Sequence, residues 1–347
     1  MKAKKIEVKF GILGLGRVVK SRISEVFKKE ITNSKVIAVY DKNNKKNKKF
    51  SKLFKVNLSH SINSFLKKEM DFIYIATESG NHAKHIKKCF DANKNVIVEK
   101  PPVLRVDQLV NLQKIALKKK LLFYVIFQNR LNKSTVFVKK FLTHKLKKKI
   151  IFVNLKLLWC RQQNYYSDWH GNWTLDGGVI AQQGIHYIDL LCHFFGRPIK
   201  CISHLENKSN KLQAEDTGIG IITFMNGINC QVSLTTALRP RDVESSIEIV
   251  MQRKLIKLHG LCCNKLSINN KNLKDFSESV PTGYGLSHSK CLQNIIDIKL
   301  KKKNKFKPLK AIETLDTLKL LNMLYRSYEK KRWVYFNEKN LKSKLGY

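Results

Sequence analysis

The sequence predicts an α/β protein of two domains, an N-terminal doubly wound parallel sheet and a C-terminal α/β domain with an open, mostly antiparallel sheet. Two observations lead to this class. In the first third of the 347-residue chain, short apolar runs alternate with stretches of helical periodicity. After Gln128, strand-like segments predominate around one apolar helix. We therefore expect one domain over residues 1–127 and a second over residues 128–347.

The N-terminal domain is expected to contain five strands joined by crossover helices. The predicted strands are VKFGILG (8–14), KVIAVYD (35–41), DFIYIAT (71–77), KNVIVEK (94–100) and LLFYVIF (121–127). Helical periodicity follows the third and fourth strands, over residues 81–92 and 106–119. Parallel strands need such crossovers, so this pattern is typical of a doubly wound nucleotide-binding sheet.

The C-terminal domain is expected to be rich in strands. The predicted strands are KIIFVNLKLLWC (149–160), GIGIITFMN (218–226), NCQVSLTTAL (229–238) and SSIEIVMQRKLIKLHG (245–260). An apolar helix is predicted over residues 176–196, and an amphipathic helix over residues 311–333. We find no internal repeat.

The formal net charge of +41 is large, and a strongly basic chain ordinarily indicates an anionic partner. The lysine runs at 41–50, 144–150 and 299–307 lack the interleaved aromatic residues of a base-stacking surface. We interpret them as solvated surface, and a non-catalytic basic nucleic-acid-binding or regulatory protein is the remote alternative. A cationic field would also favour a phosphorylated or carboxylated substrate.

Nothing in the sequence predicts secretion or a membrane span. No apolar run approaches the roughly 18 residues that a spanning helix needs. The N-terminus passes from a short basic stretch into a strand-like pattern without a cleavage site. The eight cysteines are scattered and form no C-x-x-C pattern, so we expect reduced thiols and a cytoplasmic protein.

A glycine-rich turn follows the first predicted strand. Gly14 and Gly16 match the first two glycines of the dinucleotide fingerprint, and the third position is Val19. Asp41 ends the second strand, where a carboxylate can accept hydrogen bonds from both ribose hydroxyls. The pattern predicts NAD binding, because Asp41 would repel a 2′-phosphate. Lys42 keeps NADP as an alternative.

Lys100 follows the fourth predicted strand in the segment Glu99-Lys100-Pro101-Pro102. The carboxyl end of a parallel strand points into the crevice where such sheets bind ligands. Proline fixes the backbone dihedral φ, so the chain behind the lysine is restrained. Lys100 is therefore a candidate catalytic residue.

The apolar helix predicted over 176–196 carries four aligned polar residues, Gln182, His186, Asp189 and His193. Their spacings of four, three and four place them on one face of a helix. Three interpretations remain: satisfied polar residues of the core, the lining of a substrate site, or a metal site from His186, Asp189 and His193. We favour the substrate site and expect no metal.

Together, these motifs resemble the Gfo/Idh/MocA oxidoreductase family along essentially the whole chain. The resemblance is carried by GILGLGR near the start, YIAT before a helix, EKPP after a strand, and DGGVIAQQGIHYIDLL after the domain change. It implies an N-terminal Rossmann domain and a C-terminal α/β domain whose open sheet often forms the subunit interface. A homo-oligomer, dimer or tetramer, is the corresponding expectation.

The resemblance also implies residue roles. The catalytic lysine of the family matches Lys100, and its catalytic histidine matches His186. Many members have an aspartate four residues before that histidine, where this chain has Gln182, so the pair Lys100 and His186 is the prediction. Which of the two acts as the base stays open. The cofactor-binding residues implied are Gly11, Gly14, Gly16, Arg17, Val18, Asp41, Thr77, His82, Glu99 and Lys100.

Residues 159–191 resemble, within this family, the dehydrogenases that oxidise UDP-N-acetylglucosaminuronate at its 3-position. Those enzymes typically have an Asn-Gln pair where this chain has two glutamines, and QNRLN (128–132) and YGLSHSKCLQNII (284–296) are also similar. The resemblance implies a role in nucleotide-sugar metabolism for surface polysaccharide, with oxidation of a free polyol or pyranose such as inositol as the alternative. The substrate-binding residues implied are Arg161, Tyr165, Trp173, Gln182, Gln183 and His186.

Overall fold

The computed structural model describes residues 7–280 and 283–347, which form two compact units. Unit 1 comprises Met1–Val103, Asp107–Ile126 and Leu286–Glu313, and unit 2 comprises Leu104–Val106, Phe127–Gly285 and Thr314–Tyr347. The chain therefore returns to unit 1 after most of unit 2 has been built. The domain division drawn from the sequence at residue 127 stays a prediction.

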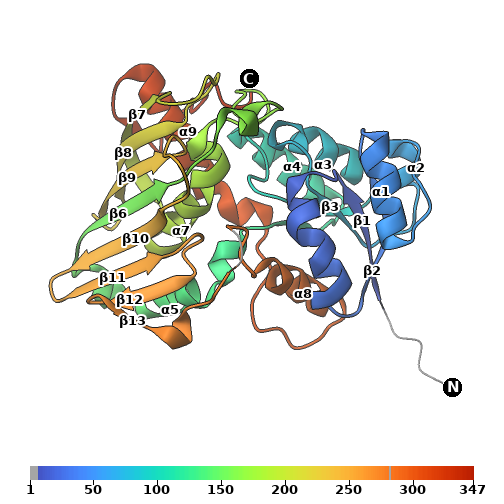
Figure 1. The fold of residues 1–347 in the computed structure, drawn as a ribbon, viewed down its shortest axis with the longest axis horizontal. Coiled ribbons are helices and arrows are strands. Elements are labelled where there is room, and N and C mark those ends of the chain that lie inside the picture. Colours follow the sequence, from blue (N-terminus) through green and yellow to red (C-terminus); the bar gives the residue numbers. More distant parts are fainter. Residues whose placement is uncertain (1–6, 281–282) are drawn as a thin grey trace. The chain divides into compact units, whose positions relative to one another are not determined.

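Unit 1 is built on a five-stranded parallel sheet in the order β2-β1-β3-β4-β5 (Figure 1). Its strands are β1 (Val8–Leu13), β2 (Ser34–Tyr40), β3 (Phe72–Ile75), β4 (Asn95–Val98) and β5 (Phe123–Val125). All five predicted strands are confirmed. Residues of β3 and most of β4 are fully buried, and burial on both faces explains why these strands are continuous apolar runs in the sequence.

Helices connect the strands of unit 1, and α8 joins them from a later part of the chain. They are η1 (Val19–Ile23), η2 (Val26–Glu30), α1 (Asn44–Phe54), α2 (Ile62–Leu66), η3 (Ser79–Asn81), α3 (His82–Asp91), α4 (Val106–Lys118) and α8 (His288–Lys299). The Asn43 side chain accepts a hydrogen bond from the Lys46 N–H and caps α1. Ser61 and Ser64 form a reciprocal capping box that starts α2. The predicted helices at 81–92 and 106–119 are confirmed within a few residues.

The sequence pattern did not predict helix α8, although this helix completes the unit 1 core. Its residues Leu292, Ile295 and Ile296 are buried in the same apolar cluster as Phe10 and Tyr74. Arg22 donates to the Leu286 carbonyl oxygen at 2.9 Å, and Gln293 accepts from the Thr32 N–H at 2.9 Å. The segment is thus packed and hydrogen-bonded into a unit that begins almost 300 residues earlier.

Unit 2 is built on a nine-stranded sheet in the order β13-β12-β11-β10-β6-β9-β8-β7-β14, and helices α7 and α9 cover one face of it (Figure 1). Its strands are β6 (Ile150–Leu158), β7 (Pro198–Glu206), β8 (Thr217–Phe224), β9 (Asn229–Thr235), β10 (Glu244–Met251), β11 (Lys254–His259), β12 (Lys265–Ile268), β13 (Lys271–Asn272) and β14 (Val334–Tyr335). Within the described part of unit 2, only β6 and β9 pair in parallel, which confirms a mostly antiparallel sheet.

The four predicted strand segments of unit 2 are confirmed, and 245–260 folds as the hairpin of β10 and β11. Strands β7, β12, β13 and β14 were missed. The helical elements of this part of the chain are η4 (Gln128–Leu131), α5 (Lys133–Phe141), α6 (His144–Lys147), η5 (Gln163–Tyr166), η6 (Ile180–Gly184), α7 (Ile185–Phe195), η7 (Lys274–Phe276), η8 (Ala311–Thr314) and α9 (Leu315–Lys330). The predicted C-terminal amphipathic helix corresponds to η8 and α9.

The apolar helix expected over 176–196 is shorter than predicted and begins with wider turns. Residues Ile180–Gly184 form the π-helix η6, which continues directly into α7 and ends at Gly196, whose φ is +87°. The apolar residues of this segment include Ile180, Ile185, Ile188, Leu191 and Phe195, and all five are buried. The sequence could not indicate η6, because π-turns within a helix leave no compositional signal.

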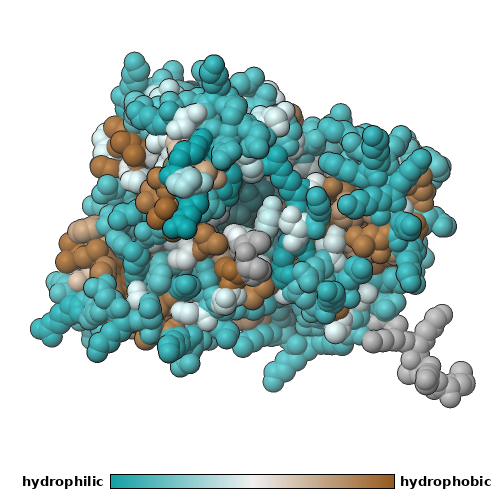
Figure 2. All heavy atoms as spheres, in the orientation of Figure 1, coloured by the Kyte–Doolittle hydropathy of each residue, from teal (hydrophilic) through white to brown (hydrophobic). Residues whose placement is uncertain are grey.

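The visible surface is mostly hydrophilic, with separate hydrophobic patches (Figure 2). Within the described residues, no helix is both long enough and apolar enough to cross a lipid bilayer.

Candidate functional site

The turn between β1 and η1 requires glycine at position 14. The φ of Gly14 is +88°, and its N–H donates to the Tyr40 carbonyl oxygen at 2.9 Å. A Cβ atom at this position would lie 2.7 Å from the Ala76 carbonyl oxygen. At Gly16 the corresponding distance is 3.8 Å, so this side of the turn is open. The turn therefore combines a tight backbone approach with an accessible edge.

Asp41 connects the end of β2 to this turn. Its Oδ2 accepts from the Leu15 N–H at 2.7 Å, and its Oδ1 accepts from the Asn43 N–H at 2.8 Å. The next residue, Lys42, forms an ion pair with Glu78 at 2.7 Å, and the hydrogen bond to Glu78 raises the pKa of Lys42. The carboxylate of Asp41 thus lies where a ribose would approach, whereas the Lys42 ammonium has an anionic partner of its own.

These residues fit a dinucleotide. The β1 strand ends at an open glycine turn, a helical segment follows, and a carboxylate lies at the end of the neighbouring strand. Val19, which occupies the third glycine position, is fully buried in the unit 1 core. Its side chain packs away from the turn, so the departure from the fingerprint does not close the site.

The other implied cofactor residues surround the same turn or lie behind it. Arg17 is exposed and Val18 is partly buried, both just after the turn. Gly11 lies within β1, where an added Cβ would meet the Met70 sulfur at 2.3 Å and the Phe65 ring at 2.8 Å. The absence of a side chain at Gly11 leaves room for Met70 and Phe65 to pack against β1. Whether these residues contact a cofactor stays a prediction.

His82 ties two loops of unit 1 together. Its Nδ1 lies 2.8 Å from the Pro101 carbonyl oxygen, and its Nε2 lies 3.1 Å from the Thr77 carbonyl oxygen. Burial lowers the pKa of His82, which is 1% exposed. The Thr77 hydroxyl in turn contacts His85 Nδ1 at 2.9 Å. His82 therefore aligns the loop after β3 with the loop that carries Lys100.

Lys100 directly follows a buried carboxylate. Glu99 is 7% exposed, and its Oε1 accepts a short hydrogen bond from the Tyr74 hydroxyl. His288 Nε2 lies 3.6 Å from the same oxygen. Burial raises the pKa of Glu99, but the contacts with His288, Tyr74 and Lys100 outweigh burial and hold that pKa below its usual range. Glu99 is thus an ionised group behind Lys100.

The carboxyl ends of four adjacent strands bring these unit 1 residues together. Gly14, Asp41, Thr77 and Glu99 follow β1, β2, β3 and β4 respectively. The strands are neighbours in the sheet, so the residues gather at one edge. Ligands bind at this edge in open parallel sheets.

The polar stripe in unit 2 divides into two parts. Gln182 and Gln183 are 8% and 6% exposed, and the Gln183 amide donates a short hydrogen bond to the Gln182 side-chain oxygen. His186 is half-buried, with the Phe127 ring edge-on at 6.2 Å. These three residues occupy η6 and the first turn of α7, and their substrate role stays a prediction.

The second part of the stripe is structural. Asp189 is fully buried, and Arg130 donates to its two oxygens at 2.7 and 2.6 Å. Thr317 donates to the same carboxylate at 2.9 Å. Burial, with nearby Arg130 and Lys139, lowers the pKa of His193 to about 3. Asp189 is therefore a satisfied core residue, which the sequence could not distinguish from a cleft residue.

The metal interpretation of this stripe gains no support. Both carboxylate oxygens of Asp189 already accept hydrogen bonds from Arg130. In residues 7–280 and 283–347, no group of three or more histidine, cysteine or acidic side chains is arranged to hold a metal ion.

The loop after β6 holds the remaining implied substrate residues. The Arg161 guanidinium donates to Asp242 at 2.9 Å and lies over the rings of Trp159 and Tyr165. Trp173 packs edge-on against the buried Tyr325 at 5.3 Å. The three implied residues lie in one loop, but Trp173 contacts the core side of that loop.

Sequence reasoning missed His170 in this loop. His170 is 8% exposed, makes a short contact with the Asp168 carboxylate, and stacks on Trp169 at 3.9 Å. Its ring also lies 4.7 Å from that of Tyr165. Asp168 and His170 lie within residues 159–191, but an Asp-x-His spacing alone carries no specific signal.

Glu215 is a second residue that sequence reasoning missed. It is 2% exposed, and its Oε1 accepts from the Ile180 N–H at 3.0 Å and from the Tyr325 hydroxyl at 2.9 Å. Burial raises the pKa of Glu215 to about 7. Gly178 lies directly against it, since a Cβ there would be 2.1 Å from the Glu215 carbonyl oxygen. This carboxyl group supports the start of the helix that carries His186.

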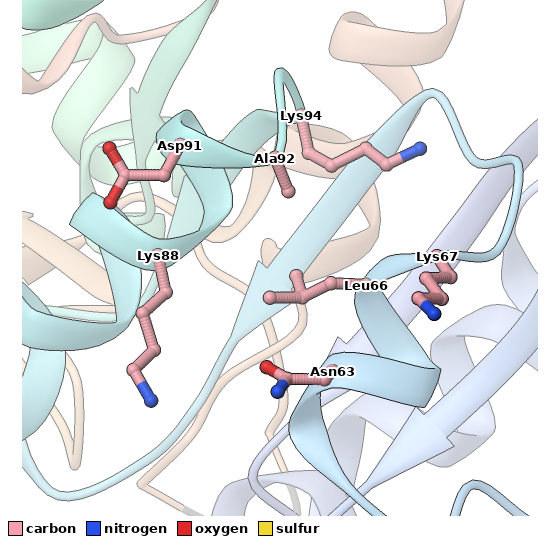
Figure 3. A pocket seen from close by; sticks show the side chains of 7 residues that line it. All are labelled: Asn63, Leu66, Lys67, Lys88, Asp91, Ala92 and Lys94. Atoms are coloured by element: carbon pink, nitrogen blue, oxygen red, sulfur yellow. The ribbon is translucent and has the colours of Figure 1, made fainter.

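A surface hollow of about 590 Å³ lies elsewhere in unit 1. It is lined by Asn63, Leu66, Lys67, Lys88, Asp91, Ala92 and Lys94 (Figure 3). These residues belong to α2, the end of α3 and the approach to β4, which is the amino edge of the sheet. The glycine turn lies at the carboxyl edge, so this hollow is not the dinucleotide site.

The parallel sheet and the glycine turn define a protein with a Rossmann-type dinucleotide-binding domain. Residues 8–127 match the family described as oxidoreductase, NAD-binding Rossmann fold, and residues 148–336 match the corresponding C-terminal alpha/beta domain. The chain belongs to the Gfo/Idh/MocA oxidoreductase family. The resemblance inferred from the motifs is thereby confirmed, as are the α/β class and the NAD cofactor.

Several known proteins are similar over most of the chain. The WlbA dehydrogenase of Bordetella pertussis, solved with NADH and UDP-GlcNAcA, is 24% identical with a TM-score of 0.84, covering 95% of this chain and 97% of that one. The WlbA dehydrogenase of Chromobacterium violaceum, solved with the same two molecules, is 24% identical with a TM-score of 0.86, covering 97% and 98%. Oxidoreductase P35 of Formosa agariphila is 25% identical over 228 residues, which are 64% of this chain and 70% of that protein.

Proposed function

We propose that this protein oxidises the 3-hydroxyl of a UDP-N-acetylated hexuronate with NAD, as a step in nucleotide-sugar metabolism for surface polysaccharide. The observation that carries the proposal is the full-length likeness to two dehydrogenases solved with NADH and UDP-GlcNAcA. The buried amide pair Gln182–Gln183 and the Arg161 loop give further support, because they match the segment in which the resemblance to these enzymes is strongest.

Lys100 and His186 carry the chemistry in this proposal. His186 or Lys100 takes the proton from the sugar hydroxyl, and the other stabilises the developing alkoxide. NAD, held by the turn at Gly14 and Gly16 and by Asp41, supplies the hydride acceptor when it is bound. Gln182 and Gln183 orient the sugar through their amide groups.

The recognition of the substrate's negative charge is proposed to begin at Arg161. Two aromatic rings and Asp242 fix its guanidinium, so little side-chain freedom is lost when a ligand binds. The net charge of +41 adds a long-range attraction for a nucleotide diphosphate that carries a uronate.

The test is formation of NADH, followed by its absorbance, when the protein is mixed with NAD and a panel of UDP-sugars with and without a 6-carboxylate. NADH with only the N-acetylated uronates supports the proposal. Oxidation of free polyols or pyranoses, with no response to any UDP-sugar, contradicts it and favours the inositol-type alternative.

Matched variants test the two catalytic residues. Lys100→Met and His186→Asn should each lower kcat/KM by about 10²- to 10⁴-fold, which is the usual contribution of a positioned acid or base. The exposed residues Lys118 and His60 provide controls of the same type, Lys118→Met and His60→Asn, which should retain full activity. Unchanged turnover in both variants would contradict the assignment of Lys100 and His186 as catalytic residues.

We also propose that the protein is a homo-oligomer through the sheet of unit 2. Ile219 and Ile221 point to the same face of β8 and are 55% and 45% exposed, whereas Ile222 and Phe224 on the opposite face are buried. Isolated apolar side chains are normal on a surface, but neighbouring ones on a regular sheet favour an interface. Sedimentation of the wild type and of Ile219→Lys should show an oligomer that the variant weakens.

A further inference from the structure

Unit 1 contains a buried polar cluster that the dinucleotide site does not account for. It joins the end of β4 to β3 and to α8, through Glu99, Tyr74 and His288. The exposed fractions of these residues are 7%, 0% and 1%. Burial of three polar side chains is costly unless each is compensated, so this group requires an explanation.

The cluster is arranged around the Glu99 carboxylate. Oε1 receives the Tyr74 hydroxyl and faces His288 Nε2 at 3.6 Å, while Oε2 accepts from the Lys100 N–H at 3.3 Å. The charged or titratable groups that interact with this cluster include Lys100 on the β4 loop, His82 on α3, Glu30 on η2 and Cys291 on α8. Lys100, the next residue in the chain, is the cationic neighbour of Glu99.

His288 is placed for this contact by α8. It is the first residue of the helix, whose apolar residues Leu292, Ile295 and Ile296 are in the unit 1 core. Among the residues that the structure describes, the His288 Nδ1 has no hydrogen-bond partner. The other ring nitrogen, Nε2, faces the Glu99 carboxylate.

We propose that His288 is a positioning residue for the reaction, which holds Glu99 as a carboxylate behind Lys100 and thereby keeps the Lys100 ammonium charged and in place. The proposal rests on the form of the proposed function in which His186 takes the proton and charged Lys100 stabilises the developing alkoxide. It predicts that the segment after residue 285, far from Lys100 in sequence, controls the charge at the candidate active site. Tyr74 supports the same carboxylate through its hydroxyl.

The contribution of His288 can be measured without a substrate. In protein labelled with ¹³C at the glutamate carboxyl, the Glu99 resonance is identified by its absence in Glu99→Gln. We expect this resonance to stay ionised from pH 5 to 9 in the wild type. In His288→Gln the Glu99 carboxylate loses a contact that offsets the effect of burial. The titration midpoint of Glu99 should therefore rise by about one pH unit or more. Tyr74→Phe, which keeps the ring, should raise it by less.

The pH profile of kcat gives the catalytic readout. The acid limb should move to higher pH in His288→Gln, and the double variant His288→Gln/Glu99→Gln should be no less active than Glu99→Gln alone. Gln293→Ala is the matched control, because it loosens α8 at Thr32 and should leave the profile unchanged.

The outcomes separate this inference from the proposed function. A Glu99 midpoint that stays at its wild-type pH in both His288→Gln and Tyr74→Phe overturns the inference, whatever the substrate. An unshifted acid limb, or additive losses in the double variant, also overturns it. A failure to oxidise any UDP-sugar contradicts the proposed function, and the acid limb is then measured with the polyol or pyranose that is oxidised.

Discussion

Glu99 in unit 1 and Glu215 in unit 2 are both buried glutamates, yet their pKa values are shifted in opposite directions. The pKa of Glu99 is lowered although burial raises it, because His288, Tyr74 and Lys100 surround the carboxylate. The pKa of Glu215 is raised to about 7, because burial is opposed only by the Ile180 N–H, the Tyr325 hydroxyl and a backbone contact, and adjacent Asp216 adds to the rise. The comparison indicates that the hydrogen-bonding and charged partners of a buried carboxyl group, as well as its depth, set the direction of its pKa shift.

The largest effect is expected from Gly178→Ala, which tests how closely Glu215 is packed. The new Cβ would lie 2.1 Å from the Glu215 carbonyl oxygen and 2.3 Å from its carboxyl carbon. Such overlap forces the backbone to move, so we expect a loss of about 3 to 4 kcal/mol in the free energy of unfolding. Urea denaturation measures it. Gly16→Ala, where the nearest atom is 3.8 Å away, should cost far less.

Glu215→Gln tests the pH dependence. A folded-state pKa of about 7, above the ordinary glutamate value of 4.5, gives stability that is full below pH 4.5 and is lost as the pH rises to about 7. The maximum effect is about 3 kcal/mol, for a shift of about 2.5 pH units at 1.36 kcal/mol per unit. Urea denaturation should show the wild type losing stability relative to the variant between pH 5 and 8. Glu69→Gln, whose side chain is 93% exposed in the wild type, should show no such difference.

Tyr325→Phe has a smaller expected effect. Its hydroxyl donates to Glu215 and accepts from the Gly178 and Ala181 N–H groups at 3.2 and 3.3 Å. Loss of this hydroxyl should cost about 1 to 2 kcal/mol in the free energy of unfolding, because buried partners are left unsatisfied. Tyr328→Phe on the same helix is the control, since Tyr328 is 38% exposed. Equal losses in the two variants would contradict the role of Tyr325.

The smallest loss of stability is expected from Lys42→Gln, which removes the ion pair with Glu78. Glu78 is less deeply buried than Glu99 and Glu215. Burial raises the pKa of Glu78, but Lys42 and other contacts outweigh burial and lower it. Lys42 is 81% exposed, so solvent screens the pair and Lys42→Gln should cost less than about 1 kcal/mol. Urea denaturation in low and high salt measures this cost. A loss that is independent of salt would indicate that the pair acts through packing.

Much of unit 1 could be predicted from the sequence. Its strands are buried on both faces and therefore appear as apolar runs, and the glycines after β1 and the acid after β2 are close to those strands in sequence. The strands at the margins of the unit 2 sheet, such as β13 and β14, are only two residues long and carry too little pattern. The local sequence pattern is sufficient to predict a strand where burial of that strand determines its residue types.

The candidate site was predictable only where a motif is continuous. Lys100 and His186 lie in recognisable segments, although their roles stay predictions. The partners that decide the charge of each site are distant in sequence, as with Arg130 for Asp189 and His288 for Glu99. A lone histidine or arginine in a chain with 67 lysine and arginine residues carries no positional signal. These pairings exist only once the chain has folded.

The return of residues Leu286–Glu313 to unit 1 has a consequence for protein synthesis. A nascent chain emerges from the ribosome in sequence order, so β1 to β5 are exposed to solvent long before α8 has been translated. Until then, the core that includes Tyr74 lacks Leu292, Ile295 and Ile296. The core of the N-terminal unit is therefore completed only after most of the C-terminal unit has been synthesised.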